Sequence, residues 1–225
     1  MDEPRFESIE QMNQAAAANL AQAAPGAAFQ LFSDAQFRRL AGFEQLSQTE
    51  QDRIFNELVL AYLVLMMLVL EAPDLRVPEE GRGYLRELNK RIPGAYVDYL
   101  RASGIENEHL RDWDRLIAMR YEEYARDRHS VRAAAMQIES AEKDLDLNDL
   151  SNIQLVLPVQ AVAIGCHAHI CRGRTDGRDE LFKATLRSLS RFYVEFRVRL
   201  EGGKITPLAR ARVAVKRAFR RLRRQ

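Results

Sequence analysis

Two uncharged stretches of the chain decide its fold. Residues 58–70 read LVLAYLVLMMLVL, and residues 150–171 read LSNIQLVLPVQAVAIGCHAHIC. As a helix, the first would be about 20 Å long, short of the roughly 30 Å hydrocarbon core of a bilayer. The second is long enough, but Asn152, Gln154 and His167 would need polar partners in lipid. We therefore expect protein to cover both stretches, as the central helices of a bundle.

The remaining chain has helical periodicity from residue 29 onward and no run that alternates apolar and polar residues as a strand would. The expected helices span about residues 48–71, 83–102, 107–143, 149–172, 179–200 and 204–225. The sequence thus predicts an all-α bundle of about six to seven helices, with the apolar helices at 48–71 and 149–172 in its centre.

The helix expected at 107–143 is long, and apolar residues recur in it every seven positions. They are Leu110, Ile117, Tyr124, Val131 and Ile138, the spacing that coiled coils use. Its length of roughly 50 Å exceeds what one compact bundle usually needs. We expect this seam to pack mainly inside one domain, and we keep a homo-oligomer formed through this helix as the alternative.

A weak internal repeat suggests how the bundle is built. Residues 58–60 and 155–157 both read LVL, and Tyr96 and Tyr193 stand at the same offset of 97 residues. Each copy would be an apolar helix, a turn and an amphipathic helix. A duplicated αα-hairpin, with the long helix joining its copies, is therefore a hypothesis.

Charge and composition divide the chain into three parts. Residues 1–27 are rich in Ala, Gln and Asn, and we expect a flexible or weakly helical arm because they offer little large apolar surface to bury. Residues 28–203 form the single helical-bundle domain. Residues 172–225 hold 17 Lys and Arg against 5 Asp and Glu, a net charge of +12, whereas the preceding 171 residues carry −10.

Residues 204–225 are expected to form a basic amphipathic helix. Leu208, Ala211, Val215, Ala218 and Leu222 fall on one stripe. The expected anion-binding residues cover the rest of it: Arg210, Lys216, Arg217, Arg220, Arg221, Arg223 and Arg224. Such a helix binds a nucleic-acid backbone, an anionic membrane or an acidic protein surface, or docks on the acidic body of its own chain. The sequence therefore favours an all-α interaction protein with an anionic partner.

A Cys/His cluster supports a different function, a metal- or cofactor-dependent helical enzyme. Cys166, His167, His169 and Cys171 carry donors typical of sites for zinc or another transition metal. On one helix, however, His167 and Cys171 share one side, and Cys166 and His169 lie on roughly the opposite side. A complete site would need ligands from elsewhere, such as His109, His129 or Glu123.

Other catalytic signatures are missing. The sequence has no Walker loop, no G-x-G-x-x-G and no G-x-S-x-G motif. Residues 144–149 begin like a calcium loop but lack its glycine and final glutamate. We infer no catalytic residue and no specific small molecule, and whether the protein is an enzyme stays open.

The N-terminus begins Met1-Asp2-Glu3, which is acidic where a secretory signal would be basic. The sequence therefore predicts a cytoplasmic protein, with peripheral membrane association as a variant. A membrane protein that spans the bilayer at the two apolar helices is the remaining alternative.

Overall fold

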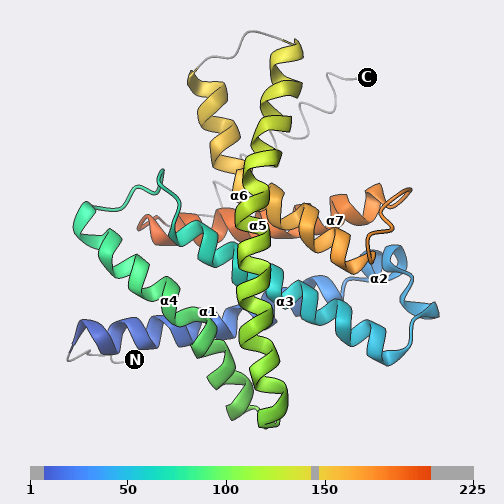
Figure 1. The fold of residues 1–225 in the computed structure, drawn as a ribbon, viewed down its shortest axis with the longest axis horizontal. Coiled ribbons are helices and arrows are strands. Elements are labelled where there is room, and N and C mark those ends of the chain that lie inside the picture. Colours follow the sequence, from blue (N-terminus) through green and yellow to red (C-terminus); the bar gives the residue numbers. More distant parts are fainter. Residues whose placement is uncertain (1–7, 143–146, 204–225) are drawn as a thin grey trace.

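The protein is an all-α bundle, and its computed structural model describes residues 8–142 and 147–203 (Figure 1). This part of the chain forms seven α-helices, a short 3-10 helix and no strand. The α-helices are α1 (Ile9–Phe32), α2 (Ala35–Ala41), α3 (Gln48–Leu70), α4 (Glu79–Ala102), α5 (Asn107–Glu142), α6 (Leu147–Ile170) and α7 (Asp179–Leu200); the 3-10 helix is Phe43–Gln45. The prediction of an all-α bundle of six to seven helices is confirmed, and the apolar helix expected at 48–71 lies at its centre.

Helix α3 is the centre of the bundle. It contacts α1, α4, α5, α6 and α7, so it is enclosed on every side, and each side chain of residues 58–70 is at most 7% exposed. Such burial is favourable by about 25 cal/mol per Å² of apolar surface removed from water. The apolar side chains of residues 58–70 are thus covered by other helices of the same chain.

Helix α6 is covered less completely. It packs against α3, α5 and α7, with Val162, Ala163 and Cys166 fully buried. Ile164 is 46% exposed, and Leu155 and Val156, which lie on other sides of the helix, are 38% and 37% exposed. This helix therefore combines buried positions with exposed apolar ones.

Residues 1–27 were expected to form a flexible or weakly helical arm, and the structure places residues 9–27 in helix α1, which packs on the bundle. Ser8 caps this helix by accepting a hydrogen bond from the backbone N–H of Gln11 (3.1 Å). Ala17, Ala21, Ala24 and Ala28 are buried along one face, which packs mainly on α4 and α3. Small methyl groups bury little area each, but they allow helices to approach closely, and alanine has the highest helix propensity.

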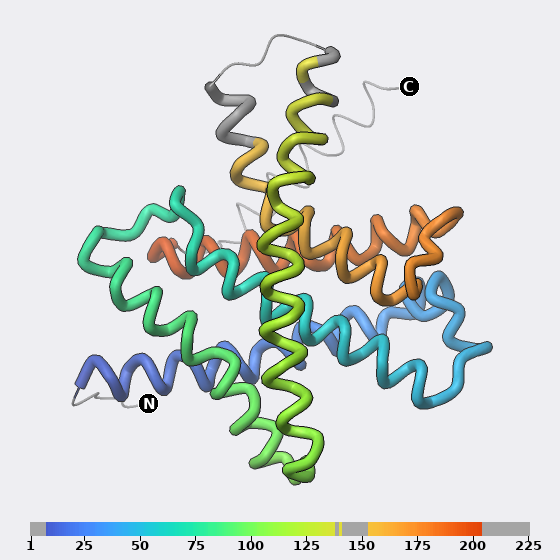
Figure 2. Tube along the Cα trace, in the orientation of Figure 1, coloured from blue at the N-terminus to red at the C-terminus, as the bar shows by residue number. Residues whose placement is uncertain are grey.

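Helix α5 crosses the front of the bundle and then projects beyond it beside the first half of α6 (Figures 1 and 2). Leu110, Ile117 and Tyr124 of the heptad seam are buried, as expected for core packing, whereas Val131 is only half-buried. The seam therefore belongs to the core of the domain until α5 leaves the body.

Two helix pairs flank α5: α3 with α4 before it, and α6 with α7 after it. Each pair is an apolar helix followed by an amphipathic one, the order that a duplicated αα-hairpin would have. Residues 204–225 lie outside the described residues, and so do all seven expected anion-binding side chains.

Candidate functional site

The Cys/His cluster lies in the last two turns of α6 and just after them, and its four side chains face different neighbours. Cys166 and His169 are directed toward α3 and α5, where they meet Glu57 and Glu123. His167 lies against Phe182 of α7, with ring centroids 5.5 Å apart. Cys171 follows the helix end and lies near Arg178. The segment is thus a junction of three helix interfaces.

Cys166 is the most deeply buried of the four. It has no exposed surface, and its Sγ lies 3.9 Å from the backbone carbonyl oxygen of Glu57. Burial, together with the nearby Glu57 carboxylate, raises the pKa of this thiol well above its usual value. Since the thiolate is the form that attacks electrophiles and binds metals, Cys166 has the environment of a structural cysteine.

A close approach of α5 to α6 determines the packing at this point. A Cβ atom at Gly165 would lie 2.2 Å from Cε1 of Tyr124, so only glycine leaves room for this ring. Tyr124 is fully buried, and its hydroxyl oxygen has no hydrogen-bond partner among the described residues. Burial raises the pKa of Tyr124 far above its usual value, which keeps the hydroxyl protonated.

A hydrogen-bonded network of four charged or polar side chains joins α3, α5 and α6. Arg120 of α5 donates to both carboxylate oxygens of Glu57 on α3, over 2.7 and 3.1 Å. It also donates to Glu123, one turn further along α5, over 3.3 Å. Nε2 of His169 on α6 lies 2.7 and 3.0 Å from the two oxygens of Glu123. Because an ionised carboxylate only accepts hydrogen bonds, this nitrogen carries the proton.

The charged groups of this Glu57–Arg120–Glu123–His169 network all have hydrogen-bond partners and are mostly shielded from water. The side chains of Glu57 and Arg120 are each 11% exposed, and those of Glu123 and His169 are 27% and 26% exposed. Bidentate contacts of this kind fix orientation. The arrangement positions α5 and α6 on α3, and His169 acts here as a structural partner of Glu123.

Sequence reasoning named His169 and Glu123 only as candidate metal ligands, and it missed Glu57 and Arg120. Arg120 stands in the sequence as a break in the heptad seam, and Glu57 as a charge beside an apolar run. A signal was present, since each is an isolated charge next to core positions and a buried charge needs a partner. The sequence does not show which of the many opposite charges supplies that partner.

His167 borders a surface cleft of about 580 Å³ between α6 and the start of α7. Ile164, Thr175, Asp176, Asp179 and Phe182 also line it. Nε2 of His167 is buried without a hydrogen-bond partner among the described residues. Burial lowers the pKa of His167 below its usual value, and a hydrogen bond with the backbone of Arg178 opposes this only in part. The imidazole is therefore neutral near pH 7.

The four donors of the Cys/His cluster do not converge on one point. Among the described residues, the one set of three donors close enough to share an ion is Glu106, Glu108 and His109, all exposed on the first turn of α5 and the loop before it. Exposed carboxylates gather in this way without a metal. Among the described residues, no three donors at α6 lie close enough together to bind one metal ion.

The basic character of the last third of the chain is visible on α7. Lys183, Arg187 and Arg191 are exposed at four-residue intervals, which places them on one stripe. Arg197 is different, because it is 8% exposed and pairs with Asp74 at 2.8 Å and Glu201 at 3.1 Å. One arginine of α7 is thus structural, and three other bases form a surface stripe.

Two described helices are long and apolar enough to cross a membrane by length and composition, Gln48–Leu70 and Ile153–Ile170. In the most apolar window of the first, 83% of the residues are buried inside the protein, and in the second 61%. The first is therefore the core helix of the bundle, and the second is partly open to solvent.

Comparison of the chain with models of protein families, with characterised proteins and with solved structures finds no match.

Proposed function

We propose that this protein is an all-α interaction protein whose basic segment 204–225 binds an anionic partner. The observation that carries the proposal is the separation of charge, with +12 in residues 172–225 and −10 in the remainder. The exposed bases Lys183, Arg187 and Arg191 of α7 support it, because they extend the basic surface onto the folded body. Arginine is suited to this role since its guanidinium binds phosphate and carboxylate in a bidentate manner.

The proposal is tested by replacing seven of the nine bases of 204–225, those named above as expected anion-binding residues, with glutamine in the full chain. Binding to a fluorescent DNA duplex and to vesicles containing anionic lipid is measured at low and moderate salt. If all seven bases contact DNA phosphates, the logarithm of the binding constant falls with the logarithm of salt with a slope of about −6. The substitutions should remove most of that slope, because only Lys204 and Arg212 of the segment remain.

The matched control replaces two exposed bases of α4, Lys90 and Arg101, which are 70% and 55% exposed. These substitutions also lower the net charge, so they separate a local binding surface from a general charge effect, and they should leave binding nearly unchanged. Absence of binding to both duplex and vesicles at low salt refutes the proposal. So does binding whose strength and salt dependence are unchanged by the seven substitutions.

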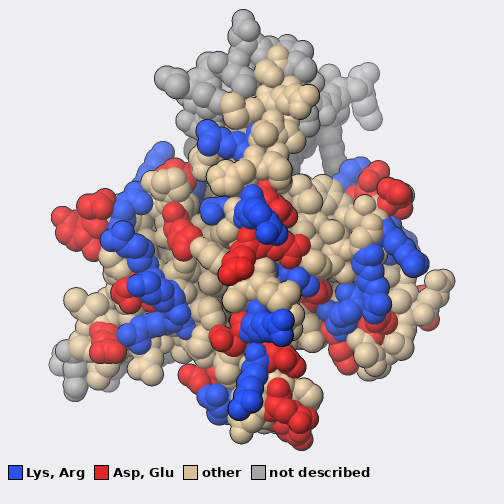
Figure 3. All heavy atoms as spheres, in the orientation of Figure 1, with Lys and Arg blue, Asp and Glu red and all other residues tan. Residues whose placement is uncertain are grey.

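A second copy of the chain is the other partner that we propose, through the projecting part of α5 and α6. Ala133 and Ala134 of α5 and Leu155 and Val156 of α6 are exposed there, and Figure 3 shows few charged side chains over the described part of the projection. Two helices cover each other on one face only, whereas a second hairpin would complete a four-helix arrangement.

The mass of the protein in solution, measured by light scattering over a range of concentrations, tests this contact. Leu155→Glu should shift the protein toward monomer. Val194→Glu is the control, because Val194 is an exposed apolar residue of α7 (54% exposed) outside the projection. A monomer at all concentrations refutes self-association.

We also propose a cytoplasmic location. The two free, buried cysteines, Cys166 and Cys171, support it, because reduced thiols are normal in that compartment. Fractionation of cells that express the full chain tests the location, and recovery of the protein only with detergent contradicts it.

A further inference from the structure

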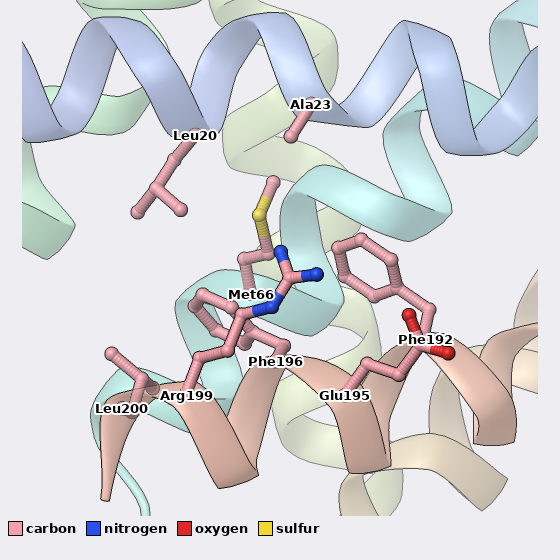
Figure 4. Close-up of a pocket in the computed structure, with 8 residues that line it drawn as sticks. All are labelled: Leu20, Ala23, Met66, Phe192, Glu195, Phe196, Arg199 and Leu200. Carbon is pink, nitrogen blue, oxygen red and sulfur yellow. The ribbon is translucent and has the colours of Figure 1, made fainter. Parts of the chain in front are cut away.

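A narrow apolar groove lies between α1 and α7, with α3 as its floor (Figure 4). Leu20 and Ala23 project into it from α1, and the Met66 side chain rises from α3 between the two walls. Phe192, Phe196 and Leu200 form the α7 wall at four-residue intervals, and Glu195 and Arg199 stand at its edge. The groove exists because α1 and α7 contact each other only slightly although both pack on α3.

The size of the groove favours side chains of another helix as its occupant. Its volume is about 270 Å³, which is below the 300–1,000 Å³ usual for small-molecule sites. The α7 wall from Phe192 to Leu200 extends for about 12 Å, at 1.5 Å per residue. A space of this shape accommodates two or three apolar side chains on one face of a helix.

The end of α7 brings the following chain close to this groove. Leu200 belongs to the α7 wall and is the last residue of α7, and Gly202 and Gly203 follow the C-cap residue Glu201. Gly202 has a φ of +73°, its N–H donates to the carbonyl of Arg199 (3.1 Å), and the N–H of Gly203 donates to the carbonyl of Val198 (2.8 Å). These two hydrogen bonds form a Schellman motif, which ends α7 and turns the chain away from its axis.

The length of the chain after Gly203 fits a return along α7. Residues 204–206 can span about 10 Å when extended, which matches the 8–10 Å between the axes of packed helices. Thr206 and Pro207 are residue types suited to begin a helix at that point. A helix from Leu208 to Leu222 would place its apolar stripe over about 21 Å, enough to cover the whole groove.

We infer that the groove between α1 and α7 is the docking site of residues 204–225, which bind there through the stripe of Leu208, Ala211 and Val215. Helix α1 contains no Lys or Arg, so a strongly basic helix meets no repulsion from that wall. For the role of the bases the inference rests on the proposed function: with the stripe in the groove, the seven expected anion-binding residues face outward. They then contact an anion without insertion of the stripe into lipid, which favours nucleic-acid phosphates as the partner.

Hydrogen–deuterium exchange of the full chain tests whether residues 204–225 dock in this groove. The amides of residues 208–222 should exchange at least about 10-fold more slowly than in an unstructured peptide, because a docked helix must open before it exchanges. Ala23→Arg places a long, charged side chain in the groove and should remove this protection. Gln22→Arg is the matched control, because Gln22 is also exposed on α1 but does not line the groove.

A second variant, Leu208→Asp, changes the segment itself and leaves the body intact, and it should remove the same protection. Exchange at the free-peptide rate in the unmodified chain overturns the inference. Equal protection in the unmodified chain and in Ala23→Arg also overturns it, because the segment is then held elsewhere. DNA binding by the unmodified chain and by the seven-glutamine variant reports on the proposed function separately, so either idea can fail while the other stands.

Discussion

Replacing Arg120 with methionine tests whether the Glu57–Arg120–Glu123–His169 network holds α3, α5 and α6 together. Methionine has a similar length but neither donates hydrogen bonds nor carries charge. The substitution leaves Glu57, whose side chain is 11% exposed, without the two hydrogen bonds of 2.7 and 3.1 Å that it accepts from Arg120. Removing one partner of a buried pair costs about 3–5 kcal/mol, a large part of the roughly 5–15 kcal/mol that stabilises a typical domain.

Urea unfolding followed by circular dichroism measures this loss. With a slope of about 3 kcal/mol per M, the midpoint for Arg120→Met should fall by about 1–2 M. The double variant with Glu57→Leu should recover most of the loss, because no buried charge then lacks a partner. Lys90→Met is the control for removal of a base, since Lys90 is 70% exposed and should change stability by less than about 0.5 kcal/mol.

A loss below about 1 kcal/mol for Arg120→Met would refute this reasoning. It would mean that water solvates Glu57 in the folded protein, so that the pair contributes no more than a surface ion pair does. A double variant no more stable than Arg120→Met alone would show that the packing of the arginine side chain matters more than its charge.

Two further predictions concern the same end of α6. Gly165→Ala should destabilise the protein by about 1–3 kcal/mol or more, because its Cβ would lie 2.2 Å from the buried ring of Tyr124. A Cβ at Gly94 meets nothing within 4 Å, so Gly94→Ala should instead stabilise α4 by up to about 1 kcal/mol. Equal effects of the two substitutions in urea unfolding would contradict this reasoning. Burial lowers the pKa of His167 in the folded protein below its usual value of 6.5, so its contribution to stability is present above pH 6.5 and is lost as the pH falls through the folded-state pKa. The loss of urea stability between pH 7 and pH 5 should therefore be smaller in His167→Gln, and an unchanged slope would show that the histidine is not responsible.

The periodicity of the sequence predicts most of the helices closely. The helix expected at 179–200 is α7 (Asp179–Leu200), and the one expected at 107–143 is α5 (Asn107–Glu142). Both carry strong signals, an amphipathic stripe in one and a heptad seam in the other. The alanine face of α1 was missed because hydrophobic patterns weigh large side chains, whereas α1 is held by close approach of small ones.

The candidate site was predicted only as a set of residues. Helical spacing indicates that Cys166 and His169 share one side of α6 and that His167 and Cys171 share another, and the structure places the first pair toward α3 and α5. The identity of their neighbours, Glu57 and Glu123, depends on contacts between residues 46 and 109 positions apart. Local periodicity carries no information about such contacts.

Local chemistry therefore determined that this chain is helical, that residues 58–70 lie inside, and that its last third is basic. Each of these follows from side chains close together in sequence, through helix geometry and the cost of apolar surface in water. Only the tertiary structure decided that Arg120 meets Glu57, that His169 meets Glu123, and that α1 and α7 diverge over Met66 to leave a groove. Those outcomes depend on how whole helices cross, and crossing is determined by all the packed faces together.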